Sequence, residues 1–426
     1  MPNRTQAPKI FDAVEFNLQL KPYTQFNLDN GVPVYTVNAG AEDVVMLEFV
    51  FYAGNWYEEK NIVAATTNFL LKNGTQTKNA FAINEHFDFY GAYLTTGCYN
   101  ETSTLTLFTL SKHLPQLLPV MAEILTQSVF PESELAIYKQ NQKQKLKVNL
   151  KKCDFVANRL IDEYVFGKNY PYGKYTTEKD YDLINRNEII SFYNEYYTQG
   201  KCIMFVAGKL PAGIELQLNK TFGNLPFNQN KNIQKQILQT PSSQKKYNIV
   251  NDENDVQSAI RMAAPFPNRH HPDFQKVQVL NTVFGGYFSS RLMSNIREDK
   301  GYTYGIHSFI QNHIHDTSWQ ISAEAGRDVA NATINEIYKE MELLQKELID
   351  DEELNLVRNY MIGSILSDLD GPFQLIARCK NYILNGLDEN YFYNSINTIK
   401  TVTAQELRQL AQKYLQPQNF YEVVVI

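Results

Sequence analysis

Apolar and polar residues alternate along the chain with two periodicities, one typical of strands and the other of helices. Residues 44–54 (VVMLEFVFYAG) predict a buried strand, and residues 105–110 alternate as a half-buried strand does. Residues 61–75 between them predict a helix, and a second helix follows from the spacing of apolar residues over 114–125. Asn30-Gly31, between two apolar runs, predicts a hairpin that opens the sheet.

The second half of the chain repeats this order. Residues 319–325 alternate as a strand does, and a helical pattern follows. Residues 184–197 (INRNEIISFYNEYY) match residues 402–415 (VTAQELRQLAQKYL) at an offset of 218. Residues 130–135 match residues 349–354 at an offset of 219. A period this long does not fit a solenoid, so it predicts a tandem duplication of one α+β domain.

The segment between the two copies is more polar than the sequence on either side of it. Residues 228–247 are polar and contain Pro241-Ser242-Ser243, which predicts an exposed linker. We therefore expect an N-terminal domain over 1–227 and a C-terminal domain over 248–426. The predicted fold class is α+β, with two homologous tandem domains that each hold a mixed β-sheet flanked by helices.

Composition and charge narrow the classes of function. The net charge of −6 argues against a general nucleic-acid binder. No apolar run approaches the about 18 residues that span a membrane, and the first residues lack the apolar core of a signal peptide. The cysteines are scattered without a CxxC pair, which favours a reducing compartment, the cytoplasm; they are Cys98, Cys153, Cys202 and Cys379. One basic run fits the solvated face of a helix; it consists of Lys139, Lys143, Lys145, Lys147, Lys151 and Lys152.

Residues 285–305 (GGYFSSRLMSNIREDKGYTYG) carry the clearest candidate chemistry. Ser289 and Ser290 can cap a helix that runs to Arg297, and Gly301 can end it in a left-handed conformation. The chain then turns into a strand, so Arg297 and Tyr304 can converge. A guanidinium and a phenol offer hydrogen-bond donors suited to peptide carbonyls and to the oxyanion of peptide cleavage.

Two other interpretations stay open for these residues. Arg297 can pair with a structural carboxylate, and Tyr304 can fill the core. Elsewhere the sequence has no GxSxG, P-loop or GxGxxG motif. Three histidine-containing pairs fit hairpin and surface positions better than metal ligands; they are His313 with His315, His270 with His271, and Glu85 with His86.

From about residue 30 to 426 the chain resembles the pitrilysin/insulinase superfamily of zinc peptidases, in particular the mitochondrial processing peptidase-like branch. The likeness rests on WYEEKNIV and LLKNGT around the first predicted helix, on FGKNYPYG, and on a block similar to GGxxSSRLxxxxRxxxGxxY. In that block nine positions agree, namely Gly285, Gly286, Ser289, Ser290, Arg291, Leu292, Arg297, Gly301 and Tyr304. The resemblance implies that Arg297 and Tyr304 reach a zinc-bound substrate, that Arg291 supports the helix, and that the paired glycines allow close backbone approach.

The family holds zinc with an H-x-x-E-H helix, whose two histidines lie on one face while the glutamate activates water. Here Ala65 and Phe69 take the places of the histidines, and Asn68 takes that of the base. The third ligand falls on Gln144 or Lys145. None of these side chains suits zinc. The family's substrate-pairing strand also departs from its N-A-x-T pattern, reading Thr95, Thr96, Gly97 and Cys98.

Together these features imply a non-catalytic subunit of a heterodimeric zinc metallopeptidase that cleaves short or unfolded peptides. A homologous partner with an intact H-x-x-E-H would bring the zinc and the base, and this chain would bind no cofactor and contribute Arg297 and Tyr304. The two would close like a clam shell around a chamber, with no role for nucleic acid or membrane. The alternative is a catalytically inert scaffold or peptide-binding homodimer of the same fold, as the family's respiratory-complex core subunits suggest.

Overall fold

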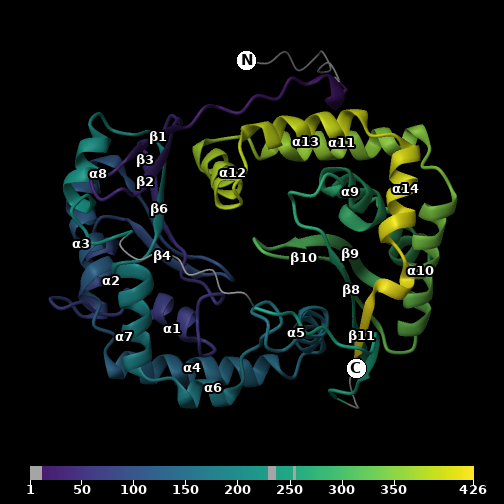
Figure 1. The fold of residues 1–426 in the computed structure, drawn as a ribbon, viewed down its shortest axis with the longest axis horizontal. Helices are drawn as coiled ribbons and strands as arrows, with labels where there is room; N and C mark the ends of the chain where they lie inside the picture. The colour runs from purple at the N-terminus through teal and green to yellow at the C-terminus, as the bar shows by residue number, and fades with distance from the viewer. Residues whose placement is uncertain (1–11, 229–236, 253–255) are drawn as a thin grey trace. The chain divides into compact units, whose positions relative to one another are not determined.

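The computed structural model describes residues 12–228, 237–252 and 256–426, so residues 229–236 of the predicted linker lie outside the described residues. The chain forms two compact units (Figure 1). The first unit comprises Pro22–Asn254 with Gly371–Asn381 and Val425–Ile426. The second unit comprises Met1–Lys21, Asp255–Asp370 and Tyr382–Val424. The domain boundaries at residues 227 and 248 stay a prediction.

The first unit is built on a six-stranded mixed sheet with the order β1-β2-β6-β3-β5-β4. β2 and β6 are parallel and the other neighbours are antiparallel. The hairpin predicted at Asn30-Gly31 joins β1 to β2, with Gly31 at a φ of 79°. The strands are β1 (Thr24–Asn27), β2 (Pro33–Asn38), β3 (Val44–Phe51), β4 (Tyr93–Cys98), β5 (Ser103–Leu110) and β6 (Cys202–Gly208).

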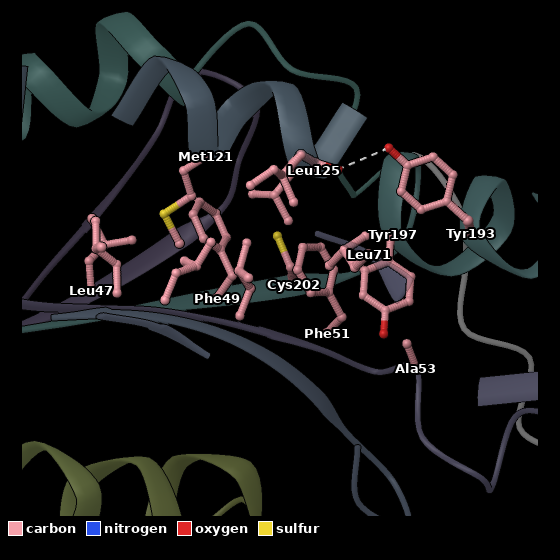
Figure 2. Packing of buried hydrophobic residues seen from close by; sticks show 14 of the residues in the cluster. Leu47, Phe49, Phe51, Ala53, Leu71, Met121, Leu125, Tyr193, Tyr197 and Cys202 are labelled. Carbon is pink, nitrogen blue, oxygen red and sulfur yellow. Dashed lines mark hydrogen bonds between the residues drawn. The ribbon is translucent and has the colours of Figure 1, made fainter. Parts of the chain in front are cut away.

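Helices cover one face of this sheet, and their apolar sides make the core. Leu47, Phe49 and Phe51 alternate along β3 and point from the sheet towards Met121 and Leu125 of the covering helix (Figure 2). The helices are α1 (Val63–Leu70), α2 (Ala80–Phe89), α3 (Leu114–Gln127), α4 (Glu132–Asn149), α5 (Cys153–Phe166), α6 (Glu178–Leu183), α7 (Arg186–Tyr193), the π-helix η3 (Asn194–Thr198) and α8 (Ile214–Phe222), with a short 3₁₀ turn η2 (Ser111–His113). The 3₁₀ turn η1 (Ala13–Glu15) belongs to the second unit.

The second sheet has the order β7-β11-β8-β10-β9. Its strands are β7 (Lys246–Ile249), β8 (Gln257–Phe266), β9 (Thr303–Asn312), β10 (Thr317–Gly326) and β11 (Tyr421–Val425). The helices that follow β7 are α9 (Phe274–Asn281), the π-helices η4 (Thr282–Gly286) and η5 (Met293–Asp299), α10 (Ala330–Lys346), α11 (Asp351–Ser367), α12 (Pro372–Leu384), α13 (Glu389–Thr401), α14 (Ala404–Tyr414) and the 3₁₀ turn η6 (Pro417–Asn419).

The duplication predicted from the sequence is visible in the order of elements. α4 and α11 begin 219 residues apart, as do α5 and α12, and β6 and β11 do so as well. α7 and α14 begin 218 residues apart. The predicted α+β class, with two homologous copies of a mixed sheet flanked by helices, is confirmed.

One helix is shorter than its sequence pattern indicates. α1 covers Val63–Leu70, whereas the pattern predicted residues 61–75. The helix begins only after Ile62, which adopts a left-handed φ of 67°, and the chain after Leu71 turns so that Gly74 bridges to Asn79. Among the described residues no helix is both long and apolar enough to cross a membrane.

Candidate functional site

The block of residues 285–305 folds within the second unit as the end of one π-helix, a short loop, a second π-helix and the start of strand β9. η4 ends at Gly286, the loop Tyr287–Ser290 follows, and a helical segment begins at Arg291 and continues as η5 from Met293. π-Helices are rare and occur mostly at functional positions, because the extra residue in the turn disrupts the regular hydrogen-bond ladder. The loop is therefore the first candidate for a site in this unit.

Gly285 lies against strand β9, and its lack of a side chain is what permits the contact. A Cβ atom on Gly285 would stand 2.7 Å from Ser308 Cβ and 2.8 Å from Ser308 N. Beneath this contact Trp319 Nε1 donates to Ser308 Oγ (2.7 Å), which donates to Asn281 Oδ1 (2.8 Å). The close backbone approach expected of the paired glycines is thus present, and a buried hydrogen-bonded network fixes it.

Gly285→Ala is expected to lower the free energy of unfolding of the second unit by about 2 kcal/mol, because the new methyl must displace backbone atoms of β9. Gly286→Ala is the matched control, since its nearest atom is 3.1 Å away, and we expect a clearly smaller loss. Urea unfolding followed by Trp319 fluorescence in a Trp56→Phe background measures both, because the chain has only these two tryptophans. Equal losses for the two variants would contradict the close-contact account.

Two contacts with α11 hold the loop from behind. Arg291 donates twice to Glu353, from Nε to Oε1 (2.8 Å) and from Nη2 to Oε2 (2.7 Å). The Tyr287 ring lies 4.9 Å, centroid to centroid, from the Tyr360 ring, with the two planes tilted by 31°. A bidentate arginine–carboxylate pair fixes orientation as well as position, so the helical turn that follows the loop is anchored to α11. This agrees with the supporting role expected of Arg291.

The two serines of the loop do not cap the helix with their side chains. Ser290 stands at the start of the helical segment, and its carbonyl accepts from Ser294 N (2.9 Å). Its Oγ is buried and has no hydrogen-bond partner among the described residues. Ser289 is exposed. The predicted serine cap is wrong in this respect, because the turn that closes the loop, with Ser290 N donating to Tyr287 O (3.1 Å), directs Oγ into the core.

Arg297 lies in the last turn of η5, half-buried, with its guanidinium carbon 4.9 Å from the centroid of the Phe288 ring. Within the described part of the chain it makes no ion pair, unlike Arg291. A cation over an aromatic face gains about 0.5–1 kcal/mol at an exposed position, enough to favour one orientation without using the guanidinium N–H groups. The structural-carboxylate interpretation of Arg297 is therefore not what the structure shows.

Tyr304 stands at an irregularity of β9 that turns it outward. Thr303 pairs with Ala325 and Ile306 with Ala323, so β9 holds one extra residue there, a β-bulge. The Thr303 hydroxyl stabilises the bulge by donating to Glu324 O (2.5 Å) and by accepting from Gly305 N (3.0 Å). Bulges often re-aim a side chain next to a site. Tyr304 is 89% exposed, so it does not fill the core.

Gly301 joins η5 to β9 with a φ of 64°, the left-handed conformation expected from the sequence. Arg297 and Tyr304 are therefore placed on either side of one sharp turn. Each offers donors that no described residue of the chain accepts. Their convergence on one ligand atom stays a prediction.

The family's zinc helix corresponds to α1 in the first unit, and there apolar packing takes the place of metal ligation. Ala65 is half-buried, and Phe69, 47% exposed, meets the ring of Tyr138 from α4 at 4.8 Å. Asn68 is 2% exposed and donates from Nδ2 to Thr104 O (3.1 Å) and to the hydroxyl of Tyr197 (3.2 Å). A neutral amide whose N–H groups are both hydrogen-bonded to buried residues cannot act as a base.

The remaining zinc-site position is also unsuited to a metal. Gln144 and Lys145 are both exposed on α4, two turns beyond Tyr138. Among the described residues no group of three or more His, Cys, Asp or Glu side chains could hold a metal ion. The side chains at the family's ligand positions do not fit zinc, so no step of a reaction is assigned to a metal on this chain.

Glu58 caps the start of α1 from within the core. Its carboxylate accepts from Ile62 N (3.2 Å) and Ala64 N (3.0 Å). Burial outweighs these bonds and raises its pKa from 4.5 to about 7.

The unfolded chain therefore releases the Glu58 proton near pH 4.5 and the folded chain near pH 7, so the folded state binds more protons between these values. Stability must fall as pH rises through this window, by about 3 kcal/mol in total. Glu58→Gln removes this titration. We expect the wild type to lose stability relative to the Glu58→Gln variant as the pH rises from 4.5 to 8, as measured by the free energies of unfolding of the two proteins. A difference between them that does not depend on pH would contradict the assignment.

Two of the histidines and two lysines of the basic run make ordinary contacts within the chain. His86 lies against Gln116 O (3.1 Å), and His271 Nδ1 accepts from Asp273 N (3.1 Å). Lys143 pairs with Asp182 and Lys147 with Glu178, which ties α4 to α6. The solvated-face interpretation of the lysine run agrees with these surface pairs.

Strand β4, with Thr95, Thr96, Gly97 and Cys98, lies at the edge of the first sheet. Lys72 donates from Nζ to Leu94 O (2.9 Å), so one backbone acceptor of this strand is occupied from within the chain. An edge strand can accept an added peptide strand. Here the edge strand differs from the family pattern in sequence, and the carbonyl of Leu94 near its start already accepts a hydrogen bond from Lys72.

Comparison with known proteins agrees with this geometry. The family model described as Insulinase (Peptidase family M16) matches residues 34–172, and the one described as Peptidase M16 inactive domain matches residues 183–361. A Bacillus subtilis protein named uncharacterized zinc protease YmxG is 24% identical over 398 residues, 91% of this chain and 95% of that protein. A Helicobacter pylori protein named non-peptidase homolog YmxG is 22% identical over 377 residues, 86% of this chain and 85% of that protein.

Solved structures share the fold. A peptidase M16 inactive domain from Pseudomonas fluorescens superposes with a TM-score of 0.85 at 20% identity, covering 95% of this chain and 98% of that one. A protease from Helicobacter pylori gives 0.86 at 17% identity, covering 96% and 100%. A chain of complex III2 from Candida albicans gives 0.73 at 13%, covering 94% and 95%. The two family models and the replaced residues of the zinc helix show that the chain belongs to peptidase family M16, the insulinase family, as a member of its non-catalytic type.

Proposed function

We propose that this chain is the non-catalytic subunit of a heterodimeric zinc metallopeptidase that cleaves short or unfolded peptides. Its partner is a homologous M16 chain with an intact H-x-x-E-H, which supplies the zinc and the general base. The two chains close like a clam shell around the substrate. This chain contributes Arg297 and Tyr304, and the complex works in the cytoplasm.

One observation carries the proposal, namely the presentation of Arg297 and Tyr304. The loop, the two π-helices and the bulge hold an arginine and a tyrosine near the surface, and no described residue accepts a hydrogen bond from either. The neighbouring Arg291, by contrast, spends its donors on Glu353. Arg297 and Tyr304 therefore keep hydrogen-bond donors available for a ligand.

The chemistry of the two side chains suits a peptide undergoing cleavage. The guanidinium is charged at all relevant pH values and presents its N–H groups in a fixed plane, while the Tyr304 hydroxyl adds a further donor. Donors aimed at the scissile carbonyl stabilise the negative charge that develops on its oxygen, and they also position the chain. Zinc on the partner would activate water; everything this chain does is binding and charge stabilisation.

Purification from the native host tests the proposal. The tagged chain is isolated from the host extract, and proteins recovered in equal amount are identified by mass spectrometry. We expect a homologous M16 chain with intact H-x-x-E-H, and chelator-sensitive cleavage of an unfolded peptide by the recovered complex. Recovery of the chain only with itself would contradict the heterodimer and support the scaffold or peptide-binding homodimer.

A further inference from the structure

Phe288 is an exposed aromatic residue on a segment of backbone that cannot move freely. Its side chain is 57% exposed. The segment is anchored on both sides, because the Tyr287 ring contacts Tyr360 and Arg291, three residues after Phe288, is bonded twice to Glu353. Exposed apolar side chains are common on protein surfaces, so exposure alone does not mark a site. A ring held rigid and open to solvent has the character of a binding contact.

The same ring defines the surroundings of Arg297. The guanidinium carbon is 4.9 Å from the ring centroid. The ring covers one face of the guanidinium plane and leaves its edges, which carry the N–H groups, for another acceptor. A carbonyl oxygen bound by those N–H groups would lie within a few ångströms of the Phe288 ring edge, and so would the side chain next to that carbonyl.

We propose that Phe288 forms an apolar subsite beside Arg297, so that the complex prefers peptides with an apolar or aromatic residue next to the carbonyl that Arg297 binds. The proposal rests on the proposed function. It adds the substrate class, because Phe288 acts as a specificity-determining residue. A polar residue at that position would lose water without gaining a partner, whereas an apolar one gains contact area.

The test uses the complex with its zinc-bearing partner and a set of quenched fluorescent nonapeptides. Each peptide carries a single Leu, Phe or Ser at one position of an otherwise constant alanine-rich sequence. In the wild-type complex we expect kcat/KM to be roughly 10- to 100-fold higher for Leu or Phe than for Ser at one position. Phe288→Ala should remove this preference, so that the Leu, Phe and Ser peptides are cleaved with similar kcat/KM. Phe288→Leu, which keeps apolar volume, should retain most of it.

Two matched variants separate the possible failures. Phe309→Ala removes another exposed phenylalanine, 40% exposed on β9, about 16 Å along the strand from Tyr304, and should leave the preference intact. Arg297→Ala should lower the rates of all peptides by the same factor. If Phe288→Ala also lowers all rates equally, or if the wild type shows no apolar preference at any position, the subsite is refuted while the function of Arg297 stands. If Arg297→Ala changes no rate, the proposed function itself fails.

Discussion

Replacing Arg297 by alanine is expected to reduce kcat of the complex by about 100-fold, with the zinc content of the partner unchanged. The reason is that one charged donor to the developing oxyanion is worth about 2.7–4 kcal/mol in a water-excluded site. Arg297 has no ion pair within the described residues, and its contact with Phe288 is weak. Its removal should therefore cost little stability. Steady-state kinetics and metal analysis of the purified complex measure the two quantities.

Two further variants at this position sharpen the result. Arg297→Lys keeps the charge but loses the planar fork, so it should recover only part of kcat. Lys300→Ala removes the same charge from an exposed residue three positions away and should leave kcat within twofold. If Lys300→Ala reduced turnover as much as Arg297→Ala, the effect would be one of overall charge, and the positioned-donor account would be wrong.

Asn68→Ala is expected to lower the free energy of unfolding of the first unit by about 3 kcal/mol. The amide donates to Thr104 O and to the Tyr197 hydroxyl, and both acceptors are buried. Each loses its partner in the variant, at about 1–3 kcal/mol apiece. The large cost follows because the family's base position has become part of the core in this chain.

The measurement is urea unfolding followed by Trp56 fluorescence in a Trp319→Phe background, which reports on the first unit. Tyr197→Phe is the partial control, since it removes one of the two contacts and should cost about 1 kcal/mol. Peptide cleavage by the complex should be unaffected at temperatures where Asn68→Ala remains folded. Loss of cleavage without loss of stability would mean that Asn68 takes part in the reaction.

The fold was predictable because it is repeated in the sequence. The matches at offsets of 218 and 219 residues correspond to helices such as α7 with α14 and α4 with α11. Local pattern and repetition supported each other there. The left-handed turn at Gly301 was also predictable, because glycine after a helical segment commonly takes that conformation.

What the sequence could not show depends on contacts between distant residues. The π-helical turn at Gly285 follows from its contact with Ser308, 23 positions later, and the outward direction of Tyr304 follows from a bulge against β10. In the sequence, Phe69 could be recognised only as a replacement for one of the family's zinc-binding histidines. Its partner, Tyr138, comes from a different helix, and nothing near Phe69 in the sequence indicates it. The missing Ser290 cap has a local cause, because the turn with Tyr287 directs the hydroxyl into the core.

The most direct test of the account is to titrate this chain into its zinc-bearing homologue and follow peptide cleavage. The account predicts that the homologue alone is nearly inactive, that activity rises linearly with added chain and stops at one equivalent, and that the Arg297→Ala chain saturates at the same ratio but with about 1% of the activity. A homologue fully active by itself, and unaffected by the added chain, would contradict it.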